Sequence, residues 1–254
     1  MESNRRPVAL VTGGSRGIGA ATALALAERG YDVAITYRNK AARASEVAAE
    51  LTRWGVRSLS VGCDITRHVD VGRLFVELRE WSDHLDLLIL NVAGGMERDL
   101  VAADPHYPMR INRDAQLVVL DGALPLMAEG GVIIYVTSHW AHLHGQVVYP
   151  PAYTSVAESK YAGEEALRAR RQELADRGMR LLFVTGDLIE GTIMTKLMER
   201  IAPGVTEDRR QRGGKLPMVT EMGQSIANAA GDTTLPSGHT VVVGGALNTV
   251  ARRE

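Results

Sequence analysis

The chain has 254 residues, of which 45% are hydrophobic and 23% charged, and its formal net charge is -1 at pH 7. This balance is typical of a globular chain with a substantial core and argues against extensive disorder. A charge so close to neutral gives no broad basic field, which argues against DNA or RNA as the partner and favours a small molecule.

The single cysteine, Cys63, excludes an intrachain disulfide and indicates a reducing compartment, where it would act as a small buried apolar residue. The first residues reach the glycines of TGG after too few apolar positions for a signal peptide. No apolar run is long enough to span a bilayer. We therefore expect a cytoplasmic protein without membrane contact.

Short apolar runs alternate with longer amphipathic stretches along nearly the whole chain, which predicts parallel strands joined by helices. The seven predicted strands are residues 8–12, 32–37, 57–61, 85–90, 131–137, 180–184 and 239–243. Helical patterns cover residues 20–29 and 40–54, and Gly30, Gly55 and Gly178 stand where helix C-caps are expected. No linker interrupts the pattern, so the sequence predicts one domain over residues 1–254.

Residues 190–218 depart from this alternation. The apolar residues expected to share one helical face there are Ile193, Met194, Leu197, Met198 and Ile201. One interpretation is a helix packed on the core or in a subunit interface. The other is a mobile lid over a substrate cleft, whose methionines adapt to a bulky apolar ligand.

The first predicted strand ends in TGGSRGIG, a glycine-rich loop ahead of an alanine-rich helix. Glycines at Gly13, Gly17 and Gly19 let the backbone turn sharply and approach a pyrophosphate, whose charge would meet the helix N-terminus. A purely structural turn is the alternative, but matching segments follow at suitable distances.

With those segments, the chain resembles the short-chain dehydrogenase/reductase family over essentially its full length. CDIT places Asp64 and Ile65 where the family contacts adenine, and NVAGG is similar to the family's NNAG with Val92 replacing an asparagine. The resemblance implies an α/β fold, a Rossmann-type doubly wound seven-stranded parallel sheet in three α/β/α layers. The cofactor-binding residues it implies are Gly13, Ser15, Arg16, Gly17, Ile18, Gly19, Arg38, Asn39, Asp64, Ile65, Asn91, Ala93, Gly94, Lys160, Gly186 and Leu188.

The second predicted strand ends in TYRNK, without the acidic residue that would bind a free ribose 2′-hydroxyl. Arg38 stands there instead, and with Arg16 it could form bidentate bonds to a 2′-phosphate. Each arginine alone could be a solvated surface charge. The pair predicts NADP(H) as the cofactor.

Reduction of a ketone needs a proton donor beside the carbonyl, which the family provides with YxxxK. Here the corresponding segment is VAESK, so Lys160 is kept while Val156, which cannot give a proton, stands in the tyrosine position. Ser138, in YVTSHWA, and Asn112, in INR, match the family's catalytic serine and its helix-kink asparagine, which supports a water-mediated proton path to the lysine. The resemblance therefore implies Ser138, Lys160 and Asn112 as the catalytic residues.

The helix that carries Lys160 is expected to begin with a capping box of Ser155 and Glu158. Tyr153 precedes Lys160 by seven residues, and on an unbroken helix it would share the lysine's face roughly 10 Å along the axis. The prolines of the sequence YPPAY make such a helix doubtful.

The loop HWAHLHGQVVYPPAY after Ser138 is longer than the family usually allows. His139, His142 and His144 could act as acids near neutral pH, and their HxxHxH spacing prompts a metal hypothesis. We predict no metal, because no nearby carboxylate or cysteine completes a ligand set. The predicted substrate-binding residues are Ser138, His139, Trp140, Tyr153, Met194 and Met198, with Trp140 able to stack on a flat ring.

Three functional interpretations remain open. The chain could be a reductase whose ketone substrate supplies the proton from an adjacent hydroxyl, or one that uses Tyr153 or a loop histidine. It could also be a non-catalytic NADP-binding regulatory or redox-sensing protein. The departures resemble atypical ketoreductases of antibiotic pathways, such as that of simocyclinone biosynthesis, which implies an NADPH-dependent enzyme for a polycyclic aromatic polyketide ketone. The family resemblance also implies a homo-oligomer, a dimer or tetramer.

Overall fold

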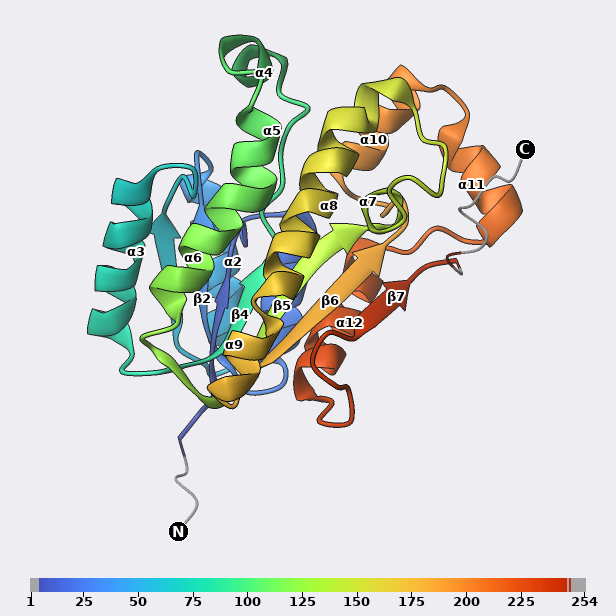
Figure 1. Cartoon of the computed structure of the whole chain (residues 1–254). Helices are drawn as coiled ribbons and strands as arrows, with labels where there is room; N and C mark the ends of the chain where they lie inside the picture. The colour runs from blue at the N-terminus through green and yellow to red at the C-terminus, as the bar shows by residue number, and fades with distance from the viewer. Residues whose placement is uncertain (1–4, 246, 248–254) are drawn as a thin grey trace.

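Seven parallel strands form one sheet in the order β3-β2-β1-β4-β5-β6-β7 (Figure 1), in a computed structural model that describes residues 5–245 and 247. The strands are β1 Val8–Val11, β2 Asp32–Tyr37, β3 Ser58–Gly62, β4 Leu85–Leu90, β5 Met127–Ser138, β6 Arg180–Gly186 and β7 Thr240–Val243. Each predicted strand is confirmed. The largest difference is at β5, which begins at Met127 and not at residue 131.

Helices cover both faces of the sheet and complete the predicted three layers. One face carries α3 His68–Trp81, α6 Ala115–Ala123, α8 Thr154–Ala169 and α9 Arg171–Asp176, and the other carries α1 Gly17–Ala27, α2 Ala41–Arg53 and α12 Val219–Gly231. Figure 1 shows α3, α6 and α8 across the near side of the sheet. In β1, Val8 and Leu10 enter one core cluster while Ala9 and Val11 enter the other, because successive strand side chains point to opposite faces. The predicted fold class is therefore confirmed.

Three glycines predicted as helix C-caps adopt the left-handed backbone that this position favours. Gly30, Gly55 and Gly178 have φ angles of +83°, +74° and +71°. Each stands between the end of a helix and the next strand, so the three predicted helix ends are confirmed.

Shorter elements gather beyond the carboxyl ends of the strands, from the top to the right-hand side of Figure 1. They are α4 Arg98–Ala103, α5 Tyr107–Met109, the π-helical turn η1 Arg110–Asp114, α7 His139–His142, the 3-10 turn η2 Pro151–Tyr153, α10 Ile193–Ile201 and α11 Val205–Gly213. A third apolar cluster lies among them, built from Trp140, Tyr153, Val156, Ala157, Leu188, Met198 and Leu216. We call it the upper cluster.

The start of α8 differs from the prediction. Residues Pro151–Tyr153 form η2, which runs directly into α8 at Thr154, and Tyr153 is the N-cap without a side-chain cap bond. The predicted Ser155 and Glu158 capping box is therefore wrong. The two prolines do not break the helix, because a proline is tolerated in a first turn, where its missing N–H has no partner to lose.

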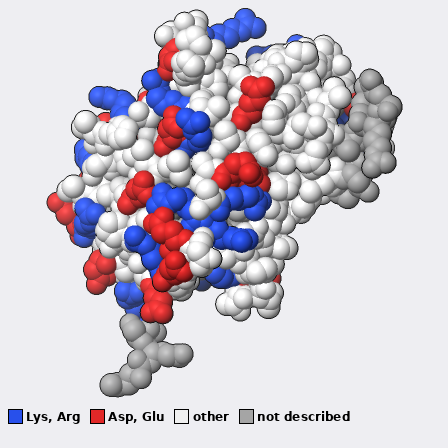
Figure 2. Space-filling model, viewed as in Figure 1, with Lys and Arg blue, Asp and Glu red and all other residues white. Residues whose placement is uncertain are grey.

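Charges of both signs intermingle on the face seen in Figure 2, mainly over α3, α6 and α9. No single sign dominates this face, in keeping with the near-neutral net charge of the chain. Among residues 5–245 and 247, no helix is both long and apolar enough to cross a membrane.

Candidate active site

The glycine-rich loop between β1 and α1 folds into a tight cradle. Gly13 N donates to Thr36 Oγ1 at 3.0 Å and Gly14 N donates to the Thr36 carbonyl at 2.9 Å, which fixes the loop to β2. A Cβ atom on Gly19 would lie only 2.4 Å from the Gly13 carbonyl oxygen, so the loop requires glycine there. Arg16, the N-cap of α1, makes no side-chain cap bond to the first N–H groups of the helix. The cradle fits a pyrophosphate.

Asn91 joins the loops after β4 and β1. Its Nδ2 donates to the Thr12 carbonyl and its backbone N donates to Thr12 Oγ1, both at 2.9 Å. The strand order reverses between β1 and β4, and α/β sheets bind ligands in the crevice at such a reversal. Ala93 is exposed at this crevice, and Gly94 is held by the side chain of Asn112.

A cavity of about 430 Å³ lies beyond the ends of β2 and β3. Its lining residues are Arg38, Asn39, Asp64, Glu97, Arg98, Asp99 and Leu100. The predicted residues Arg38, Asn39 and Asp64 are therefore together in one cavity, of a size suited to an adenosine group. Arg38 Nη1 also donates to the hydroxyl of Tyr107 at 2.9 Å.

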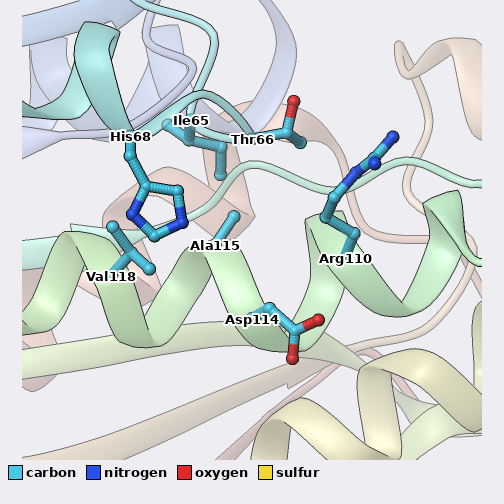
Figure 3. A pocket seen from close by; sticks show the side chains of 7 residues that line it. All are labelled: Ile65, Thr66, His68, Arg110, Asp114, Ala115 and Val118. Carbon is cyan, nitrogen blue, oxygen red and sulfur yellow. The ribbon is translucent and has the colours of Figure 1, made fainter.

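Ile65 lines a different hollow from its neighbour Asp64. Figure 3 shows this second cavity, of about 160 Å³, where Ile65 and His68 face the helical residues Ala115 and Val118. Of the remaining predicted contacts in the glycine loop, Ser15 is half-buried and Ile18 packs partly against the core. One cavity therefore holds the predicted cofactor residues Arg38, Asn39 and Asp64, whereas Ile65 lines another.

Ser138 ends β5, pairs with Gly186 of β6, and meets a tyrosine. Its Oγ lies 3.1 Å from the Tyr153 hydroxyl and accepts a bond from Ala141 N at the start of α7. Tyr153 is 4% exposed, and burial raises the pKa of its phenol although the Ser138 bond opposes this. The phenol is neutral at pH 7, and its hydrogen bond fixes the serine hydroxyl.

Lys160 is buried on α8, one turn after Val156. No hydrogen bond or ion pair joins its ammonium to another residue within 5–245 and 247, and burial lowers its pKa from 10.5 to about 8, against the attraction of Glu164. Its donors are therefore available to a ligand in the crevice.

Asn112 lies in the π-helical turn η1, which confirms that it occupies a helix irregularity. Its side chain bonds to Gly94 and, through Nδ2, to Ser159 Oγ at 2.9 Å. Its carbonyl accepts a hydrogen bond from the Tyr135 hydroxyl at 3.1 Å. A Cβ atom on Gly163 would lie 2.1 Å from that carbonyl, so glycine lets α8 approach η1 closely.

The three histidines of the loop have three separate environments. His139 is 1% exposed, its ring nitrogens bond to Thr185 Oγ1 and the Gly245 carbonyl, and burial lowers its pKa to about 4. His142 Nδ1 lies 2.7 Å from Glu164 Oε1, and His144 Nδ1 lies 2.8 Å from the Tyr149 hydroxyl. His139 as a substrate-binding residue or acid is therefore a wrong assignment, because its ring is neutral and both nitrogens are engaged. No group of metal-ligating side chains occurs among the described residues.

The upper cluster surrounds Val156 and borders Ser138. Trp140 and Tyr153 meet edge to face with ring centroids 5.1 Å apart, so Trp140 is packed and not free in the loop. Met198 is fully buried in the cluster and Met194 packs at its margin. Leu188, which follows Gly186 after β6, joins the same cluster.

Residues 190–218 form α10 and α11 and are fastened to the rest of the molecule. Glu190 and Met218 form a parallel bridge at the two ends of the segment. Arg209 of α11 forms a buried ion pair with Asp187, in which its Nε lies 3.1 Å from Oδ1. Ile193 is 56% exposed, so the predicted apolar face of α10 is covered only in part.

The sequence analysis did not identify three groups around this site. They are the Tyr107 contact of Arg38, the Asp187–Arg209 pair, and Glu164 with its partners His142 and Arg168. Most of these contacts join residues from different elements, which the sequence does not reveal. Glu164 is the exception, because it stands on α8 four residues after Lys160 and four residues before Arg168. This helical spacing was the available signal.

Comparison with known proteins decides the family. A family model described as short chain dehydrogenase matches residues 7–202. The chain belongs to this family. The 1-cyclohexenylcarbonyl-CoA reductase of Streptomyces collinus is 32% identical over 257 residues, which cover 98% of this chain and 89% of the relative. The hydroxynaphthalene reductase-like protein Arp2 of Metarhizium brunneum is 28% identical and covers 87% of this chain and 86% of its own.

Solved structures of this short chain dehydrogenase fold superpose well. A short chain dehydrogenase from Burkholderia cenocepacia in complex with NADP gives a TM-score of 0.83 at 29% identity, over 95% of this chain and 98% of the other. The promiscuous reductase LugOII, which catalyses keto-reduction at C1 during lugdunomycin biosynthesis, gives 0.80 at 27% identity, with the same coverage. The chain is thus similar to reductases along nearly its full length.

Proposed function

We propose that this short chain dehydrogenase is an NADPH-dependent ketoreductase for a bulky, polycyclic aromatic ketone of polyketide type. The observation that carries the proposal is the position of Ser138, held by Tyr153 at the edge of an apolar cluster and near the cofactor crevice. The names of the relatives, a hydroxynaphthalene reductase-like protein and a reductase of lugdunomycin biosynthesis, support the substrate class.

The crevice residues fit NADP(H). The glycine cradle would hold the pyrophosphate, Lys160 the nicotinamide ribose, and Arg38 with Arg16 the 2′-phosphate. The unpartnered Lys160 ammonium supports this, as does the NADP bound to the Burkholderia relative. When bound, NADPH supplies the hydride for the ketone carbon. The other cofactor contacts that the family motifs imply, Gly186 and Leu188 included, are proposed as well.

The proton is proposed to come from the substrate. Val156, at the position of the family's tyrosine, has no proton to give and is 1% exposed within the upper cluster. A hydroxyl adjacent to the ketone would transfer its proton to the carbonyl oxygen as the new C–H bond forms, and the resulting phenolate would take a proton from water. The Ser138 hydroxyl donates a hydrogen bond to the same oxygen as charge develops on it.

Tyr153 is the second candidate donor, because its hydroxyl lies 3.1 Å from Ser138 Oγ. Its phenol is buried with a raised pKa, and Lys160 stands seven residues further along, roughly 10 Å on a helix. A phenol with a raised pKa is a weaker acid for this step. Tyr153 therefore serves to orient Ser138 in the proposed mechanism.

A pair of matched substrates tests the proposal. NADPH oxidation is measured with a polycyclic ketone that bears an adjacent hydroxyl and with its O-methyl ether. The hydroxyl-bearing ketone should be reduced, whereas the ether should bind without turnover. Normal reduction of the ether would assign the proton to the protein. Binding of NADPH without reduction of any ketone would favour the regulatory or redox-sensing alternative.

The upper cluster would receive the apolar rings of the substrate. Trp140, Met194 and Met198 are the proposed contacts, and residues 190–218 the proposed lid of a single domain that spans residues 1–254. Residues 1–4, 246 and 248–254 of that domain lie outside the described residues. The Asp187–Arg209 pair holds this lid against the body.

The protein is also proposed to form a homo-oligomer, a dimer or tetramer, which membership of the family supports. Neither nucleic acid nor a membrane is proposed as a partner. Cys63 is a buried free thiol, and burial raises its pKa to about 12, so the thiol is protonated and unreactive at pH 7. A chain with one such cysteine suits the reducing cytoplasm.

A further inference from the structure

A tyrosine from outside the cofactor loops reaches the arginine at the end of β2. Tyr107 opens α5, 69 residues after Arg38, and accepts a hydrogen bond of 2.9 Å from Arg38 Nη1. Its side chain belongs to the core cluster that contains Ile65 and Ile111, and the residue is 3% exposed. The fold therefore fixes the position of this hydroxyl.

The Tyr107 hydroxyl is a neutral acceptor. Burial and the charge of Glu97 raise the pKa of its phenol, although the Arg38 guanidinium opposes this. The guanidinium of Arg110 lies over the ring, 5.9 Å from its centroid, and adds to the support of the side chain. The hydroxyl can therefore hold one end of the Arg38 guanidinium without neutralising its charge.

Arg38 forms no ion pair with the acidic residues that line its cavity. These residues are Asp64, Glu97 and Asp99. A guanidinium has five N–H donors, and within residues 5–245 and 247 only the bond to Tyr107 engages it. The remaining donors stay available to an anion that enters the cavity.

We infer that Tyr107 is a specificity-determining positioning residue for the 2′-phosphate of the cofactor. By holding Nη1 of Arg38, it keeps the guanidinium from the three cavity carboxylates and presents the other donors to the phosphate. The inference rests on the proposed use of NADP(H). Without the hydroxyl, Arg38 regains side-chain freedom that must be lost again on binding.

Calorimetric titrations of the full chain test the inference. The ligands are 2′,5′-ADP and ADP, as probes of the adenosine site, and the complete cofactors NADPH and NADH. Tyr107→Phe keeps the ring and removes the hydroxyl. We expect the affinity for 2′,5′-ADP and NADPH to fall about two- to tenfold, from the ordering of one long side chain. The affinity for ADP and NADH should stay as in the wild type. Equal losses for both kinds of probe, or no loss, would overturn the inference.

Three controls separate the possible causes. Tyr37→Phe removes a hydroxyl at the end of β2 that does not contact Arg38, and should leave all four affinities unchanged. In the Arg38→Ala background, Tyr107→Phe should cause no further loss, whereas an additional loss would show a purely structural role. If the wild type itself binds ADP as tightly as 2′,5′-ADP, the proposed cofactor preference fails, independently of what the Tyr107 variant does.

Discussion

Replacing Lys160 by methionine should make the protein more stable and inactive. Lys160 is 8% exposed, and burial lowers its pKa from 10.5 to about 8. Because one pKa unit corresponds to about 1.4 kcal/mol, the folded state is penalised by about 3 kcal/mol at pH 7. Lys160→Met keeps a long apolar stem without the charge, so its free energy of unfolding should be higher by up to about 3 kcal/mol.

This stability difference should depend on pH in one direction. Between about pH 8 and 10.5 the unfolded chain binds more protons at Lys160 than the folded chain, so the wild type gains stability as pH rises. The advantage of the variant should shrink to about 2 kcal/mol at pH 9. Urea unfolding without cofactor at pH 7 and 9 measures it, with the exposed Lys196→Met as control. A variant that is less stable, or whose advantage grows with pH, refutes the reasoning.

Three further predictions concern the cradle and the buried charges. Gly19→Ala puts a Cβ atom 2.4 Å from the Gly13 carbonyl and should lower NADPH affinity by roughly tenfold or more in a fluorescence titration, so unchanged affinity would contradict the cradle. Asp187→Asn replaces the carboxylate of this buried pair with an uncharged amide and should lower the free energy of unfolding by about 1.5–3 kcal/mol in urea, whereas an unchanged free energy of unfolding would contradict a stabilising role for the pair. Burial opposes ionisation of the Glu164 carboxyl, but hydrogen bonds from its partners outweigh this effect and lower its pKa. The ionised carboxylate therefore stabilises the fold above the unfolded pKa of 4.5, and this stabilisation is lost as pH falls through the lower folded pKa. Glu164→Gln should therefore lower the thermal midpoint at pH 7 and less so at pH 4, and an equal loss at both would contradict this.

Local patterns in the sequence were sufficient for the strands and helix ends, whereas the doubly wound sheet followed from the family resemblance. Each strand is a short apolar run, and glycines such as Gly30 and Gly55 end helices where their positive φ is needed, so both signals are contained in a few neighbouring residues. The glycine cradle is equally local, because Gly13 and Gly19 belong to one turn. These features required no knowledge of tertiary contacts.

The contacts that shape the site depend on tertiary structure. Tyr153 meets Ser138 from η2, which continues into α8, although the two prolines of the sequence argued against such a continuous helix. His139 looked like an acid until its burial beside Thr185 placed its pKa near 4. The bond between Arg38 and Tyr107 spans 69 residues, and no periodicity in the sequence reports such a pair.

The most direct test of the central claim, that the substrate provides the proton, is the single-turnover rate of NADPH oxidation by Tyr153→Phe. The rate is measured with a hydroxyl-bearing polycyclic ketone and with its O-methyl ether. We predict that the variant reduces the hydroxyl-bearing ketone within about tenfold of the wild-type rate, since only the orientation of Ser138 is lost, and that neither protein reduces the ether. A loss of about 10²- to 10⁴-fold in the variant, together with reduction of the ether by the wild type, would identify Tyr153 as the general acid and contradict the claim.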